Sequence, residues 1–154
     1  VMVETGSSAL HLNNNISCRE VYSIIKDIEH YPRYMSDVVS VNILKSDSSE
    51  HISTWNVSIE GCPLTWTSRN AFRDRQYKYA FESIDGDFDL LKGVWEVKKI
   101  ASGVAIAFSI TYDLGIPTIE DVLAPILKVK LEKNLNNMLA GIKKALEDQQ
   151  KSIA

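Results

Sequence analysis

At the centre of the chain stands IDGDFDLLKGVW, residues 84–95. Asp85-Gly86-Asp87 is a typical turn sequence, and the residues on either side of it alternate in the manner of β-strands. The same pattern extends outward in both directions. We predict strands at residues 37–45, 50–60, 63–73, 76–84, 88–99 and 104–113. Because short turns join them, an antiparallel meander is expected.

Further elements flank this meander. Residues 8–13 alternate as a first strand, and Ser17 with Glu20 has the spacing of a capping box that opens a helix. Pro32 predicts the end of that helix at Tyr31, and a short second turn through Tyr34 and Met35 follows. Residues 119–148 predict one long amphipathic helix, with apolar positions that include Ile126 and Met138.

These elements predict one α+β domain. Seven antiparallel strands would curve around the long C-terminal helix, with two short helices between the first and second strands. About 1–7 and 149–154 are expected to be disordered ends. At 154 residues, the chain is long enough for one substantial core.

Composition narrows the class of protein. A net charge of −3 and a pI near 5.6 give no sign of a nucleic-acid partner. Neither a membrane span nor a signal peptide is evident, so we expect a cytoplasmic protein, monomeric or homodimeric. Cys18 and Cys62 are expected to stay reduced, and the histidines lie far apart in sequence, so neither metal nor cofactor is expected.

Strand parity predicts a cavity on one face of the sheet. The expected substrate-binding residues are Trp55, Trp66, Phe81, Ser83, Trp95, Phe108 and Met138. The polar side chains expected on this face are those of Ser68, Asn70, Tyr77, Tyr79, Ser83 and Tyr112. Each would need a hydrogen-bond partner if buried, because an unpaired buried polar group costs about 1–3 kcal/mol. Water and an oxygen-bearing ligand in a cavity would supply such partners, whereas hydroxyls at the rim could also reach solvent. Gly93 would bend its strand or leave room for the ligand.

Three segments resemble the START-like, helix-grip superfamily. They are Asp27–Pro32, Trp66–Asn70 and Asp85–Trp95, the last similar to a segment of polyketide cyclases/aromatases and coenzyme Q-binding START proteins. The resemblance implies that a hydrophobic molecule binds between the sheet and the long helix. In the aromatase/cyclase branch, this is a poly-β-ketone that can be presented on an acyl carrier protein.

The resemblance is uneven at individual positions. Trp66 and Ser68 match polar and aromatic positions of that branch, but Asn70 stands where it has an inward arginine. Arg69 has the opposite parity, and Val38 stands where a tyrosine is expected.

Two functions remain open from the sequence. The first is a cofactor-independent cyclase/dehydratase, with Ser68 and Asn70 as donors and a tyrosine (Tyr77, Tyr79 or Tyr112) as the acid. Its base would come from Asp85, Asp87, Asp113 or His30, although acidic residues at turns are usually only turn formers. The second function is a carrier or chaperone for a quinone, isoprenoid or other lipid. A weaker third hypothesis is a partner-binding protein with a vestigial cavity. We take the cyclase as the first hypothesis.

Overall fold

The computed structural model describes residues 4–12, 17–101 and 103–115. Of the C-terminal stretch it describes residues 125, 126, 129, 130, 133, 136, 137, 140, 141, 143–145 and 148.

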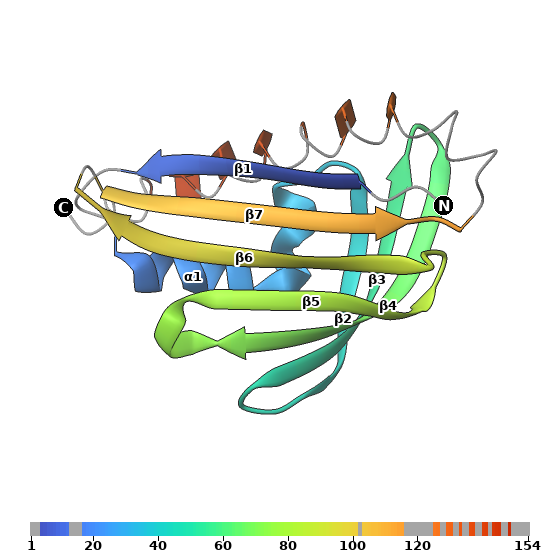
Figure 1. Cartoon of the computed structure of the whole chain (residues 1–154), viewed down its shortest axis with the longest axis horizontal. Coiled ribbons are helices and arrows are strands. Elements are labelled where there is room, and N and C mark those ends of the chain that lie inside the picture. The colour runs from blue at the N-terminus through green and yellow to red at the C-terminus, as the bar shows by residue number, and fades with distance from the viewer. Residues whose placement is uncertain are drawn as a thin grey trace.

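Seven strands form one antiparallel sheet in this part of the chain (Figure 1). They are β1 (Glu4–Leu12), β2 (Val38–Ser46), β3 (Glu50–Ile59), β4 (Cys62–Arg73), β5 (Lys78–Gly86), β6 (Leu90–Ile100) and β7 (Gly103–Asp113). Their order is β1-β7-β6-β5-β4-β3-β2, so β2 to β7 form the predicted meander and the first strand lies beside the last. The seven predicted strands are thus confirmed, with ends shifted by a few residues.

The N-terminal strand differs most from its prediction. It begins at Glu4 rather than at residue 8, because residues 4–7 pair with residues 109–112 of β7. These residues therefore belong to the sheet, although the expected disordered end, residues 1–7, included them. Backbone pairing with β7 is a long-range contact that local alternation does not reveal.

Two short helices follow β1, as predicted, but their boundary is different. The helix α1 (Cys18–Lys26) is capped by Ser17, whose hydroxyl accepts a hydrogen bond from the Glu20 amide at 3.1 Å. It ends before Tyr31 because Asp27 leaves the helical region (φ −82°, ψ 68°). A 3₁₀ helix, η1 (Ile28–Arg33), then continues through Pro32.

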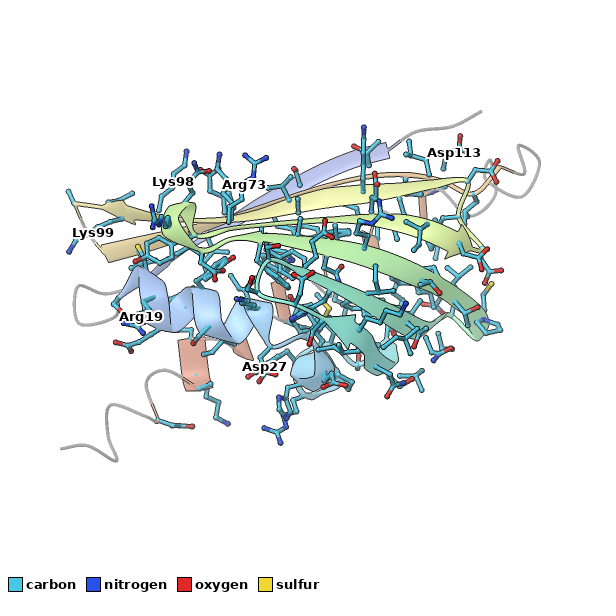
Figure 2. The ribbon with its side chains drawn as sticks, turned by 90° about the horizontal axis from the view of Figure 1, so that it is seen from below. Arg19, Asp27, Arg73, Lys98, Lys99 and Asp113 are labelled. Carbon is cyan, nitrogen blue, oxygen red and sulfur yellow. The ribbon has the colours of Figure 1, made fainter. Side chains whose placement is uncertain are left out.

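The inner face of the sheet is the one that α1 and η1 cover. Val21, Ile25 and Ile28 of these helices are fully buried in the core. Figure 2 shows α1 and the labelled Asp27 on one side of the strands, with Arg73 and Lys98 on the other. We call that second side the outer face.

The described residues between 125 and 148 are all helical, which agrees with the predicted C-terminal helix where it is described. Their contacts with the rest of the molecule include an ion pair, with Lys130 Nζ 2.9 Å from Glu60 Oε1, and the close approach of Gly141 to the ring of Tyr34. Ile126, which the sequence placed on the buried face, is 40% exposed. The rest of the predicted helix lies outside the described residues.

Candidate ligand-binding site

A cavity of about 120 Å³ lies on the inner face of the sheet. The described residues that line it are Tyr31, Met35, Trp55, Trp66, Tyr79, Phe81, Leu91, Trp95, Phe108 and Ile110. Five of the predicted substrate-binding residues are among them, together with Tyr79. The chain has three tryptophans, and all of them are on this wall.

Ring contacts hold the wall together in two groups. In one group, Trp55 stacks on Trp66 with ring centroids 5.7 Å apart and planes 6° apart. In the other group, Phe108 lies 4.4 Å from Trp95 and is stacked 5.9 Å from Phe81. Such contacts add about 0.5–1.5 kcal/mol each beyond the burial of apolar area. The cavity therefore has a largely preformed aromatic wall.

The two inward polar residues of β4 are satisfied by other protein groups. Ser68 Oγ donates to Asn70 Oδ1 at 2.8 Å, and Asn70 Nδ2 donates to Ser53 Oγ at 2.7 Å. Ser53 Oγ also accepts from the indole N–H of Trp55 at 2.9 Å. Ser53, Ser68 and Asn70 are at most 1% exposed, and none of them is among the described lining residues. We call these three residues and Trp55 the Ser53–Asn70 network; it reaches the cavity only through Trp55.

This network weakens one argument made from the sequence. The polar side chains of the inner face were expected to need water or a ligand as partners, but Ser68 and Asn70 find them within the sheet. Ser83 does the same, because its hydroxyl donates to the backbone carbonyl of Asp85 at 3.2 Å. The polar residues alone therefore do not imply an oxygen-bearing ligand.

Two predicted tyrosines and Met138 are not brought to the described cavity wall. Tyr77 lies in a turn after the 3₁₀ helix η2 (Asp74–Gln76), with φ 53°, so the alternation of β5 does not extend to it. Its ring lies 5.7 Å from that of Tyr22 on α1. Tyr112 is buried, with its ring 6.4 Å from that of Phe88. Met138 lies outside the described residues.

Gly93 does not leave room for a ligand. A Cβ atom built on it would lie 2.4 Å from Cζ of Phe81, its cross-strand partner, and 2.5 Å from the Ser109 carbonyl oxygen. The ring of Phe81 thus occupies the space that a side chain at position 93 would take. This is the aromatic rescue of a strand glycine, in which a neighbouring ring covers the exposed backbone.

The candidate bases lie away from the cavity wall. Asp113 accepts from the Gly115 amide at 2.8 Å, as turn-forming carboxylates do, and Asp87 accepts from the Thr65 amide on β4, also at 2.8 Å. Asp85 is exposed, and His30 is an exposed residue bonded to Asp27. Within the described part of the chain, no group of three or more potential ligands could hold a metal ion.

The phenols on the wall stay protonated at neutral pH. Burial, with a smaller effect of the neighbouring Tyr79, raises the pKa of Tyr31 well above its ordinary value. Burial likewise raises the pKa of Tyr79. The Tyr31 hydroxyl already donates to the Ile25 carbonyl. The Tyr79 phenol can therefore donate a hydrogen bond but cannot remove a proton, and the single O–H of Tyr31 is already used.

The predicted site left out Tyr31, Met35, Leu91 and Ile110 of the cavity wall, and Ser53 behind it. Leu91 and Ile110 share the strand parity of the predicted Trp95 and Phe108. Tyr31 and Met35 come from η1 and the turn after it, where neither strand parity nor helical periodicity indicates which way a side chain points. Ser53 shares the parity of Trp55, two residues later, so a longer predicted inner face on β3 would have included it.

A family model described as "Polyketide cyclase / dehydrase and lipid transport" matches residues 15–139. The chain belongs to this family. The ribosome association toxin RatA of Escherichia coli strain K12 is 24% identical over 113 residues, which are 73% of this chain and 71% of RatA.

Two solved structures show the same fold. The protein TTHA0849 from Thermus thermophilus has a TM-score of 0.78 at 22% sequence identity. The superposition covers 93% of this chain and 95% of the TTHA0849 chain. The Zhui aromatase/cyclase from Streptomyces sp. R1128 has a TM-score of 0.79 at 13% sequence identity, and the superposition covers 94% of this chain and 96% of the Zhui chain. These similarities support the helix-grip fold. Among the described residues, no helix is long and apolar enough to cross a membrane.

Proposed function

We propose that this member of the polyketide cyclase/dehydrase and lipid transport family binds an apolar, ring-bearing molecule and releases it unchanged. The observation that carries this proposal is the composition of the cavity wall: aromatic and aliphatic carbon lines most of the space, and two polar groups on the wall, the Trp55 indole N–H and the Tyr31 hydroxyl, are bonded to other protein groups. Pockets for small molecules are typically apolar with a few oriented polar groups.

The size of the cavity limits the bound portion of the ligand. About 120 Å³ is close to the roughly 150 Å³ of an engineered cavity that binds benzene. One ring between the Trp55–Trp66 stack and the Phe81–Phe108 stack fits this volume. A larger molecule, such as a quinone with an isoprenoid tail, would place its ring here and its tail outside.

A cyclase/dehydratase is the second candidate, and Tyr79 is the observation that favours it. Its protonated phenol is on the cavity wall and could donate to a developing enolate oxygen. Aldol closure also needs a base. Since no carboxylate or imidazole is among the described lining residues, the structure supplies only half of this chemistry.

Intrinsic fluorescence tests the binding proposal, because the three tryptophans that emit all line the cavity. Titration with decylubiquinone should quench them with saturation at one molecule per chain. The Ile110→Phe variant narrows the cavity and should weaken binding at least tenfold. Ala107→Val, on the outer face of the same strand, is the matched control and should bind like the wild type.

Linear quenching without saturation would contradict the proposal, and so would an equal loss of affinity in Ile110→Phe and Ala107→Val. The second candidate has its own test: incubation with an N-acetylcysteamine thioester of a short poly-β-ketone, analysed by mass spectrometry. A product that is 18 mass units lighter, formed by the wild type and lost in Tyr79→Phe, would favour the cyclase.

A further inference from the structure

The outer face of the sheet carries a second, larger hollow. It has a volume of about 430 Å³, and we call it the outer trough. Its floor is the row Ala71, Ala80, Val94 and Ser109, which the strand register places side by side from β4 to β7. Small side chains on four neighbouring strands leave this row lower than the rows on either side.

Charged rows stand on both sides of this floor, and one of the two rows lines the trough. One row is Arg69, Glu82 and Lys92, which are cross-strand partners on β4, β5 and β6 and line the trough. The other row is Arg73, Lys78 and Glu96, two residues further along each strand. Figure 2 shows Arg73 and Lys98 projecting from this side, away from α1.

The outer face is basic although the chain is acidic. Five cations (Arg69, Arg73, Lys78, Lys92 and Lys98) and three carboxylates (Glu82, Asp85 and Glu96) stand on the outer positions of β4 to β6, whereas the whole chain has a net charge of −3. Glu96 lies 3.8 Å from Lys78 and 3.6 Å from Lys98. Within the part of the chain that the structure describes, Arg69, Glu82 and Lys92 have no ion-pair partner.

The dimensions of the trough match an α-helix that lies across the strands. Neighbouring strands are about 4.8 Å apart, so Arg69 and Lys92 stand about 10 Å apart with Glu82 between them. Seven residues of an α-helix span about 10.5 Å. The bordering rows are four residues apart along the strands, about 13 Å, and a helix with its side chains is about 10–12 Å wide.

We propose that the outer trough binds an acidic helix of a partner protein. The helix would present carboxylates seven residues apart to Arg69 and Lys92, with a lysine between them for Glu82. Its small apolar side chains would enter the trough over Ala71 and Ala80. The alternating signs of the border distinguish this partner from a nucleic acid, because Glu82 would repel a row of phosphates. The outer positions of β4 to β7 also carry no aromatic residue on which a base could stack.

A synthetic peptide supplies the probe. It is a fluorescein-labelled, alanine-rich helix of about 20 residues, long enough to be helical, with glutamates every seventh residue and lysines midway between. Anisotropy at low salt should show saturable binding. Arg69→Glu with Lys92→Glu should weaken it at least tenfold, while Arg33→Glu with Lys144→Glu, the same charge change at exposed positions on η1 and on the C-terminal helix, should weaken it less than twofold.

The deciding experiment reverses charges on both the protein and the peptide. A peptide with lysines and glutamates interchanged should bind the Arg69→Glu/Lys92→Glu variant at least tenfold more tightly than the wild type. Ala80→Leu fills the floor and should weaken the original peptide without changing its salt dependence. The proposal is overturned if the exchanged peptide does not prefer the variant, or if both double variants lose affinity equally. Tighter binding of a 20-nucleotide RNA or of phosphatidylglycerol vesicles than of the peptide would overturn it as well.

Discussion

Replacing Asn70 by alanine should destabilise the protein by about 3 kcal/mol. The substitution removes two hydrogen bonds, to Ser68 and to Ser53, worth about 1 kcal/mol each. It also leaves two fully buried hydroxyls with fewer partners and a small void, since Asn70 is 0% exposed. Ser53 keeps its bond from Trp55, which limits the loss.

The assay is urea denaturation followed by far-UV circular dichroism, with the m-value as a check that the unfolding reaction is unchanged. Asn56→Ala is the matched control. Asn56 lies on the same sheet, is half-buried and makes one side-chain hydrogen bond, to Ser40 at 2.9 Å, so this substitution should cost about 1 kcal/mol or less.

The Ser53–Asn70 network also predicts that the losses of unfolding free energy caused by substitutions within it are not additive. The triple variant Ser53→Ala/Ser68→Ala/Asn70→Leu replaces the three buried polar residues of the network by apolar ones. No buried hydroxyl is then left unsatisfied among them, and the Trp55 indole N–H loses its acceptor. Its cost should be lower than the sum of the three single costs by at least about 1 kcal/mol. If Asn70→Ala costs no more than Asn56→Ala, or if the three effects add, the network does not hold this part of the sheet together.

Three further outcomes follow from individual contacts. Gly141→Ala should destabilise the fold by about 1–3 kcal/mol because the new Cβ would lie 2.5 Å from Cδ1 of Tyr34, and Tyr34→Ala should relieve most of that cost in urea denaturation. Gly93→Ala should cost a similar amount by the same assay, through its clash with the neighbouring ring and carbonyl; a neutral effect would show that this ring can move freely. Burial and Lys26 lower the pKa of His51 below its ordinary value of 6.5, so the unfolded chain binds the proton more readily and stability should fall as the pH drops below about 6.5. His51→Phe should flatten this part of the stability–pH curve, and equal slopes in the wild type and in His51→Phe would contradict the assignment.

Strand parity predicted the inner face well where a strand is regular. Trp66, Ser68 and Asn70 share that face on β4, as expected from their spacing. The parity prediction was wrong at Tyr77. Tyr77 has a left-handed backbone conformation between η2 and β5, so the alternation of β5 does not extend to it.

Contacts between strands were not predictable from the sequence alone. The role of Gly93 depends on the residue opposite it, and the register that pairs it with Phe81 is a property of the folded sheet. The same is true of Ser53, which lies across from Ser68. The sequence indicated that polar groups face inward, but only the register shows that they satisfy one another.

Native mass spectrometry of the freshly purified protein tests the central claim most directly, with Ile110→Phe and Ala107→Val measured beside the wild type. A carrier should retain one apolar ring-bearing molecule per chain, in the wild type and in Ala107→Val but not in Ile110→Phe. After extraction and re-addition to the emptied protein, that molecule should return with its mass unchanged. Retention that is equal in all three proteins, or recovery of the molecule in a cyclised or dehydrated form, would contradict the account.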